Sequence, residues 1–168
     1  TRPLIGFDYD GMPHLRIEHR VIPGGPTIVD MIANAAMFFG LMQSLMSTDV
    51  PPEQQLPFAI ARDNFYAAAQ HGMDAHVTWL DGQRSTVQHL LREHLLPMAR
   101  RGLEQLEIDS GDLNRYLGVI ENRIHSGQTG SVWQRAYVTR HVHDMAAMTN
   151  AYYEHQEKGA PVHEWDID

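Results

Sequence analysis

Hydrophobic and polar residues alternate near the start of the chain, over residues 14–22 (HLRIEHRVI). Four side chains fall on one face of this segment: Leu15, Ile17, His19 and Val21. The opposite face carries Arg16, Glu18 and Arg20. Because successive side chains of a strand point to opposite sides, the two-residue period predicts a β-strand. The charged face is either a surface ladder of ion pairs, which contributes little, or part of a binding site, and the alternation alone favours neither.

A long apolar segment follows the turn sequence PGGP at residues 23–26. Thr27 and Asp30 have the spacing of a capping box, with Asp in place of the usual Glu. Residues 27–47 are apolar on nearly every side of a helix, which predicts the central helix of the core. The methionines of this helix are typical of core packing rather than of a cofactor site.

The rest of the chain is predicted to be helical, with one short hairpin. The predicted elements are a loop at 49–57, a helix at 58–70 closed by Gly72, a hairpin around Asp81-Gly82, a helix at 86–106 that Pro97 should kink, a helix from its cap at Ser110 to Gly127, a helix at 131–158 and an irregular tail. No internal repeat is visible. We therefore expect residues 1–168 to form a single, mainly α domain with a short N-terminal strand and a small hairpin.

The composition narrows the class of protein. With 168 residues, 43% of them hydrophobic and 20% charged, the chain can bury a sizeable core. A net charge of −8 argues against a nucleic-acid-binding protein. The absence of cysteine excludes disulfides, thiolate metal sites and a cysteine nucleophile, and it fits a cytoplasmic protein. Asp30, Asn34 and Gln43 make residues 27–47 too polar for a membrane span.

The predicted strand at 14–22 requires a partner, because a lone strand cannot satisfy its own backbone hydrogen bonds. The chain starts at Thr1 without an initiator methionine, and this strand follows within about fifteen residues. We expect either that the strand pairs within this chain or that the chain is a fragment of a larger protein.

The eleven histidines suggest a metal site only weakly. His141, His143 and Asp144 are close in sequence, but helical residues two apart do not face each other. We therefore interpret them as solvated residues on a helix surface. The chain has no HExxH, GxxxxGK or GxSxG motif, which removes the usual signals for a zinc protease, a phosphate loop and a serine hydrolase.

Three arginine-bearing stretches stand out in this apolar, helical chain. The first is the charged strand face, and the second places Arg62, Asp63 and Asn64 near the start of a predicted helix. The third, residues 126–136, has a glycine-containing loop before Gln134 and Arg135. Arginine and helix N-termini both favour anions, so the three stretches together predict one anionic ligand.

The same three stretches resemble the C-terminal part of the second family of glutamate–cysteine ligases, carboxylate–amine ligases related to glutamine synthetase. LRIEHRVIPGGPTIVDMIANAAMFFGLM is similar to that family's Glu-x-Arg strand, turn and long buried helix. RDNFYAAAQHGMDA resembles its Asn-aromatic-x-Ala-Ala-Arg-x-Gly segment, although Gln70 stands where the family has arginine. SGQTGSVWQRAYV resembles the loop before its late Gln-Arg helix. The resemblance covers about residues 14–155.

The resemblance implies an ATP-dependent ligation in a glutamine-synthetase-like α+β fold, of which this chain would be the C-terminal part. Glutamate is phosphorylated on its γ-carboxylate, and cysteine or another amine then attacks the acyl phosphate. By the resemblance, Glu18 is a Mg²⁺ ligand, and Arg20 and Arg135 act on the reacting groups. The nucleotide-binding candidates are Arg16 on the same strand face and Arg62 and Asn64 in the second stretch. The nucleotide-binding strands and other carboxylates are expected upstream, so the chain alone should be inactive.

A second interpretation of the sequence is that the protein has no catalytic activity. The chain would be a helical module for interaction or oligomerisation, with its charged strand face as a ladder of ion pairs. A bare strand edge is prone to association, so a homodimer is possible whether the protein is a ligase or an interaction module. The two hypotheses differ in the sequence that they expect before Thr1, because only the ligase requires further strands rich in glutamate there.

Overall fold

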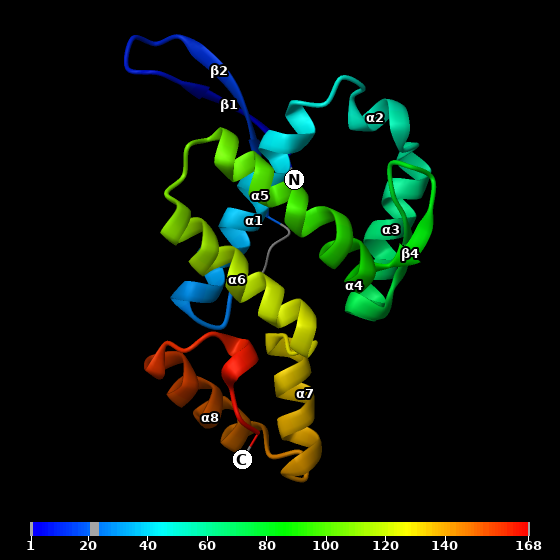
Figure 1. The fold of residues 1–168 in the computed structure, drawn as a ribbon. Coiled ribbons are helices and arrows are strands. Elements are labelled where there is room, and N and C mark those ends of the chain that lie inside the picture. Colours follow the sequence, from blue (N-terminus) through cyan, green and yellow to red (C-terminus); the bar gives the residue numbers. More distant parts are fainter. Residues whose placement is uncertain (1, 21–23, 168) are drawn as a thin grey trace.

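The computed structural model describes residues 2–20 and 24–167 and is mainly helical (Figure 1). Two hairpins, each a two-stranded antiparallel sheet, accompany the helices. A bundle of α1, α5 and α6 forms the body, and the α3 region lies to one side of it. The pair α7–α8 lies at the opposite end of the molecule from the first hairpin (Figure 1). The predicted fold class is confirmed.

The N-terminal hairpin consists of β1 (Arg2–Phe7) and β2 (Pro13–Glu18). Its register pairs Ile5 with Leu15 and Pro3 with Ile17, so the predicted strand finds its partner within this chain. The sequence patterns did not predict β1. The strand predicted over 14–22 ends at Glu18, and positions 21 and 22 lie outside the described residues.

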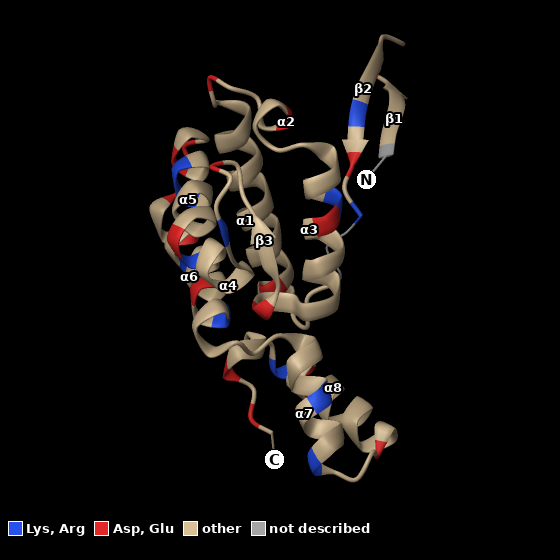
Figure 2. Ribbon diagram, turned by 90° about the vertical axis from the view of Figure 1, so that its right-hand side faces the viewer, with Lys and Arg blue, Asp and Glu red and all other residues tan. Residues whose placement is uncertain are grey.

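One face of this hairpin is apolar and open to solvent. It carries Ile5, Phe7, Leu15 and Ile17, each 70% exposed or more. Figures 1 and 2 show the hairpin extending away from the helical body. Leu15 and Ile17, from the apolar half of the predicted strand, therefore face outward, where a core face would normally be covered.

The central helix α1 (Ile28–Met46) starts where the capping pattern predicted. The Thr27 hydroxyl accepts from the backbone N–H of Asp30. The helix crosses α5 (Leu96–Gln105) at very short range, because Gly40 and Gly102 face each other's backbones. A Cβ on Gly102 would lie 1.9 Å from the carbonyl oxygen of Gly40, so only glycine fits there.

By length and hydropathy, α1 is the one described helix that could cross a membrane, with a window mean of 1.4. Only 22% of this window is buried, so the central helix is covered on one side rather than all round. Asp30 on its first turn is fully buried in an ion pair with Arg123, and Ala33 and Met37 lie in the core with Leu117. The same test is passed by many core helices, so it adds little to the membrane question.

The predicted loop at 49–57 contains a single short helix, α2 (Pro52–Gln55). The predicted second helix is confirmed as α3 (Phe58–His71), which ends at Gly72 and continues as the 3-10 turn η1 (Gly72–Asp74). The predicted hairpin is confirmed as β3 (His76–Thr78) and β4 (Arg84–Thr86).

The third predicted helix starts as α4 (Val87–Leu90) and passes through π-helical turns, η2 (Leu91–Leu95), into α5. The irregularity lies directly before Pro97, which cannot donate a backbone hydrogen bond. The fourth helix is α6 (Ser110–Ser126), capped by Asp109 rather than by Ser110.

The predicted helix at 131–158 is wrong in its middle. The chain forms α7 (Gly130–Arg140) and α8 (Met145–Lys158), with a turn between them. Val142 and His143 have φ values of 53° and 65°, and the Asp144 side chain accepts from the N–H of Ala147 to start α8. Asp144 is therefore a cap, which apolar periodicity alone did not reveal.

The tail is also more ordered than predicted. It forms the 3-10 turn η3 (Val162–Glu164) and folds back over α7 and α8. A second small core results, built from Trp133, Val162 and Trp165 with Tyr137 and Tyr152 packed against it. This core places the C-terminal segment against the first turn of α1.

Candidate functional site

Glu18, the last residue of β2, forms an ion pair with Arg20 just beyond the strand. The guanidinium of Arg20 lies 2.7 Å from the carboxylate of Glu18. Between them, the ring of His19 stacks on Phe38 of α1 with centroids 4.1 Å apart, which anchors this segment to the helix. Arg16 is exposed on the same strand. The sequence prediction that these residues share one region is confirmed for Glu18 and Arg20.

The predicted residues of α3 contact residues of α3 itself and of the neighbouring strand β3. Arg62 pairs with its neighbour Asp63 at 2.8 Å. Asn64 is used by the backbone of β3: its amide nitrogen donates to the Thr78 carbonyl, and its oxygen accepts from the Thr78 N–H. Asn64 thus fastens α3 to the second hairpin.

Two cavities lie near the start of α7. The first, called here the α1–α7 cavity, has a volume of about 660 Å³. The second, the α3–α7 cavity, is more polar, measures about 770 Å³ and contains Arg135. Met73, Thr129 and Ser131 line both, so the two cavities adjoin each other. Neither lining includes Arg62 or Asn64.

The three arginine-bearing stretches therefore do not meet at one point in this structure. Figure 1 shows β2, α3 and α7 at three different sides of the α1–α5–α6 bundle. Arg135 reaches the α3–α7 cavity, whereas Arg20 lies with Glu18 at the end of β2. The link between the two regions is Phe38, which stacks on His19 and also lines the α1–α7 cavity.

The family of the chain follows from a comparison with family models. The model described as glutamate-cysteine ligase family 2 matches residues 9–159, which is most of the chain and leaves out β1 and the C-terminal turn η3. The chain belongs to this family. No curated protein and no solved structure matches it.

Membership of the glutamate-cysteine ligase family 2 raises the question of a bound metal. Mg²⁺ binds in proteins through carboxylates together with substrate phosphates and waters. Over residues 2–20 and 24–167, no group of three or more His, Asp or Glu side chains is placed to hold a metal ion. Glu18 supplies a single carboxylate on β2. These residues do not by themselves fit a complete Mg²⁺ site.

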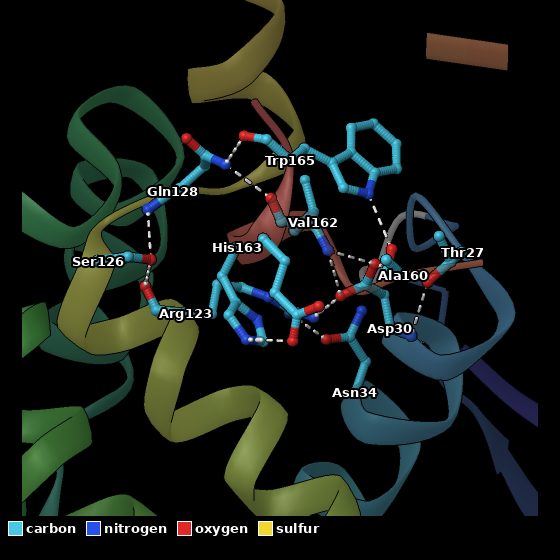
Figure 3. Close-up of polar contacts among 11 residues, drawn as sticks. Thr27, Asp30, Asn34, Arg123, Ser126, Gln128, Ala160, Val162, His163 and Trp165 are labelled. Carbon is cyan, nitrogen blue, oxygen red and sulfur yellow. Dashed lines mark hydrogen bonds and ion pairs between the residues drawn. The ribbon is translucent and has the colours of Figure 1, made fainter. Parts of the chain in front are cut away.

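A buried polar network, which the sequence reading missed, lies beside the α1–α7 cavity (Figure 3). Its centre is Asp30, fully buried, which forms a 2.6 Å ion pair with Arg123 of α6. Arg123 also donates to the amide oxygen of Asn34 at 2.7 Å. The Asp30 carboxylate further accepts from the hydroxyl of Thr27 and from the backbone N–H of Val162.

This network joins distant parts of the ligase-family chain. Asp30 and Arg123 are 93 residues apart, and Val162 is 132 residues from Asp30. Gln128 holds the same C-terminal turn, because its amide donates to the carbonyls of Val162 and Trp165 at 2.8 Å each (Figure 3). The signal in the sequence was slight: Asp30 stood out as a capping residue and as a polar residue in an apolar helix, and nothing singled out Arg123.

The network also affects Tyr152 of α8, which lines the α1–α7 cavity. Burial raises the pKa of the Tyr152 hydroxyl, and the nearby negative charge of Asp30 raises it further. The hydroxyl therefore stays protonated at neutral pH and remains a hydrogen-bond donor. It lies next to Gly130, the first residue of α7.

Proposed function

We propose that this chain forms part of an ATP-dependent carboxylate–amine ligase of the glutamate–cysteine type. The γ-carboxylate of glutamate attacks the terminal phosphate of ATP and releases ADP. The amine of cysteine, or of a related acceptor, then attacks the acyl phosphate, and phosphate leaves as the amide forms. The family match over residues 9–159 carries this proposal.

The proposed roles rest on the charged end of β2. Phosphoryl and acyl transfer depend on positioning and charge neutralisation more than on a nucleophile from the protein. Arg20 has a planar guanidinium suited to a phosphate or carboxylate. Its partner Glu18 is the carboxylate that β2 offers towards a metal, with the other ligands coming from elsewhere. Arg16 is proposed on the nucleotide side, whereas Arg135, Arg62 and Asn64 lie in other regions of this structure and carry no role in the proposal.

The exposed apolar face of the first hairpin supports a larger sheet in the working enzyme. Ile5, Phe7, Leu15 and Ile17 are too exposed for a finished core face. A two-stranded hairpin is marginally stable alone, and further strands stacked or paired on it would cover this surface. We propose that such strands supply the remaining carboxylates and that ATP binds between them and β2. We also propose that the enzyme is located in the cytoplasm.

The test measures glutamate- and cysteine-dependent ADP release by the protein encoded by the complete reading frame. Glu18→Gln and Arg20→Ala should each lower kcat/KM at least about a hundredfold, or roughly 2.7 kcal/mol of transition-state stabilisation. Arg16→Ala should cost less. Equal, mild losses at all three positions would identify a surface ladder and reject the proposed roles.

The 168-residue chain alone provides the complementary measurement. Titration of MgATP in a calorimeter should give weak binding or none, and glutamate with cysteine should release no phosphate. Micromolar ATP affinity, or any glutamate-dependent turnover, would show that the site is complete within these residues.

A non-catalytic interaction module remains the second candidate, favoured by a second exposed apolar surface. On α1 this surface comprises Ile28, Met31, Ile32, Phe39, Met42 and Met46. A helix stripe of this kind suits an oligomer interface. Sedimentation of the isolated chain separates the cases: a tight dimer with intact β2 charges and no ligase activity in the complete protein would favour the module.

A further inference from the structure

The α1–α7 cavity has an apolar body and one polar end. Its wall consists of side chains from α1, η1, η2 and α6: Met37, Phe38, Leu41, Met73, Leu91, Ile120 and Ile124. Its volume of about 660 Å³ is within the range of small-molecule binding sites. No aspartate or glutamate is among its lining residues.

The polar end gathers hydrogen-bond donors at the start of α7. A Cβ placed on Gly130 would lie 3.7 Å from the Tyr152 hydroxyl, so this hydroxyl borders the first turn of the helix. Thr129 caps the N–H of Val132, and the N–H groups of Gly130 and Ser131 precede it. The first N–H groups of a helix have no partner within it and favour negative charge.

Two side chains at this end still have hydrogen-bonding capacity. Within the described part of the chain, neither the Gln134 amide nor the Tyr152 hydroxyl forms a hydrogen bond, and both line the cavity. The carboxylate of Asp30 does not face an occupant as a free acceptor, because Thr27, Arg123 and Val162 already use its oxygens. The cavity thus offers donors at its polar end and mostly carbon along its wall, where Asn34 and Arg123 are the polar lining residues and are hydrogen-bonded to each other.

We propose that the α1–α7 cavity binds a small organic anion, a carboxylate on an apolar or aromatic body. The carboxylate accepts from the Tyr152 hydroxyl, the Gln134 amide and the first N–H groups of α7, and the body packs against Phe38 and Leu41. An ammonium group or a divalent cation finds no acidic partner in this lining, so free amino acids and MgATP are not its ligands. This inference does not depend on the proposed ligase activity.

Three probes of equal size test the head-group preference. They are 4-phenylbutyrate, 4-phenylbutanol and 4-phenylbutylamine, each titrated into the 168-residue chain by isothermal calorimetry at pH 7. The carboxylate should bind at least about tenfold more tightly than the alcohol, and the amine should bind least well. Equal affinities, or a preference for the amine, would overturn the proposal.

Two variants with matched controls place the site. Tyr152→Phe removes one hydroxyl and should reduce the affinity for 4-phenylbutyrate about tenfold while leaving that for 4-phenylbutanol unchanged. Tyr153→Phe, at the next, exposed position of α8, should change neither affinity. Leu41→Phe narrows the cavity and should weaken all three probes, whereas Leu45→Phe, one turn along α1 and outside the lining, should not.

These variants also separate the cavity from the exposed apolar faces of the hairpin and α1. Binding that survives Leu41→Phe, or that loses the same amount with Tyr152→Phe and Tyr153→Phe, would place the probe on those surfaces and reject the cavity. Circular dichroism of each variant should match that of the parent chain. Since no measurement uses ATP or turnover, a negative result here leaves the ligase proposal standing, and an inactive ligase leaves this inference standing.

Discussion

Two arginine–carboxylate pairs in this molecule have nearly the same length and very different surroundings. Arg20 lies 2.7 Å from Glu18, and Arg123 lies 2.6 Å from Asp30. The first pair has side chains 61% and 28% exposed, whereas those of the second are 14% and 0% exposed. The distance between the charges therefore says little about what each pair does, and the desolvation around it says more.

The difference indicates that the exposed pair is suited to binding a ligand and the buried pair to holding the fold together. The exposed pair joins residues only two apart at the end of β2, and the exposed guanidinium of Arg20 can exchange the carboxylate for a ligand. The buried pair joins α1 to α6 and, through Val162, to the C-terminal turn. It can exchange partners only if the domain opens. Figure 2 shows the charged end of β2 outside the helical body.

Breaking the buried pair should have the largest effect. Arg123→Met keeps much of the side-chain volume but leaves the Asp30 carboxylate charged and without its guanidinium. We expect it to lower the free energy of unfolding by about 3–5 kcal/mol. Urea denaturation followed by tryptophan fluorescence would measure this loss. Arg115→Met, exposed on the same helix, is the control and should change the stability by less than about 0.5 kcal/mol. A similar small loss for Arg123→Met would mean that the buried pair is replaceable.

Removing both charges sharpens the comparison. Asp30→Asn keeps an acceptor for the N–H of Val162, and together with Arg123→Met it leaves no buried charge. The double variant should be more stable than Arg123→Met alone by about 1–3 kcal/mol, since an uncompensated charge costs more than a lost pair. The double-mutant cycle from the same urea curves gives this coupling. Additive losses would show that the two side chains act independently.

The sequence predicted the parts of the fold that local patterns determine. The α1 cap, the Gly72 stop and the hairpin around Asp81-Gly82 all depend on residues within a few positions of each other, and all are confirmed. The break at 141–144 was missed because the apolar spacing continues across it, although Asp144 is a good cap. The strand β1 was missed because its sequence, RPLIGF, contains Pro3 and Gly6 and shows no polar–apolar alternation.

The contacts of the charged and polar residues also fall into those that local sequence predicts and those that it does not. The alternation placed Glu18 and Arg20 on one side, and their side chains do meet, although β2 ends at Glu18 and Arg20 follows it. The pairing of Asp30 with Arg123 could not be predicted, because no spacing rule connects positions 93 residues apart. Asn64 has a side chain suited to a ligand, yet its hydrogen bonds go to the Thr78 backbone. Residue type alone does not distinguish these uses.

The exposed pair on β2 should contribute little to folding, in contrast to its proposed catalytic role. Glu18→Gln should change the free energy of unfolding of the 168-residue chain by at most about 1 kcal/mol. That small difference should shrink in 1 M NaCl, where the Debye length is about 3 Å. The contribution of the buried pair should persist at this salt concentration. Thermal unfolding at low and high salt measures both. A loss above about 2 kcal/mol for Glu18→Gln would make the pair structural.

The smallest effect concerns a third pair, Arg92 and Glu93, on the π-helical turns of η2. The Arg92 side chain donates to the Glu93 carboxylate at 2.6 Å. This hydrogen bond and the Arg92 charge lower the pKa of Glu93, to which His89 and His94 add smaller contributions. Because the folded pKa is lowered, the resulting stabilisation is present above the unfolded pKa of about 4.3 and is lost as the pH falls through the folded value.

Removing Arg92 should therefore matter at neutral pH and not in acid. An NMR titration of the Glu93 carboxyl should show its pKa rising towards the ordinary value in Arg92→Ala, with a residual lowering left by the two histidines. Arg92→Lys keeps the charge but loses the Nε–H bond, so its Glu93 pKa should fall between those of the parent chain and Arg92→Ala. The stability difference between the parent and Arg92→Ala should vanish as the pH falls below the folded pKa of Glu93. An unchanged Glu93 pKa in both variants would show that solvent screening cancels even a well-formed surface pair.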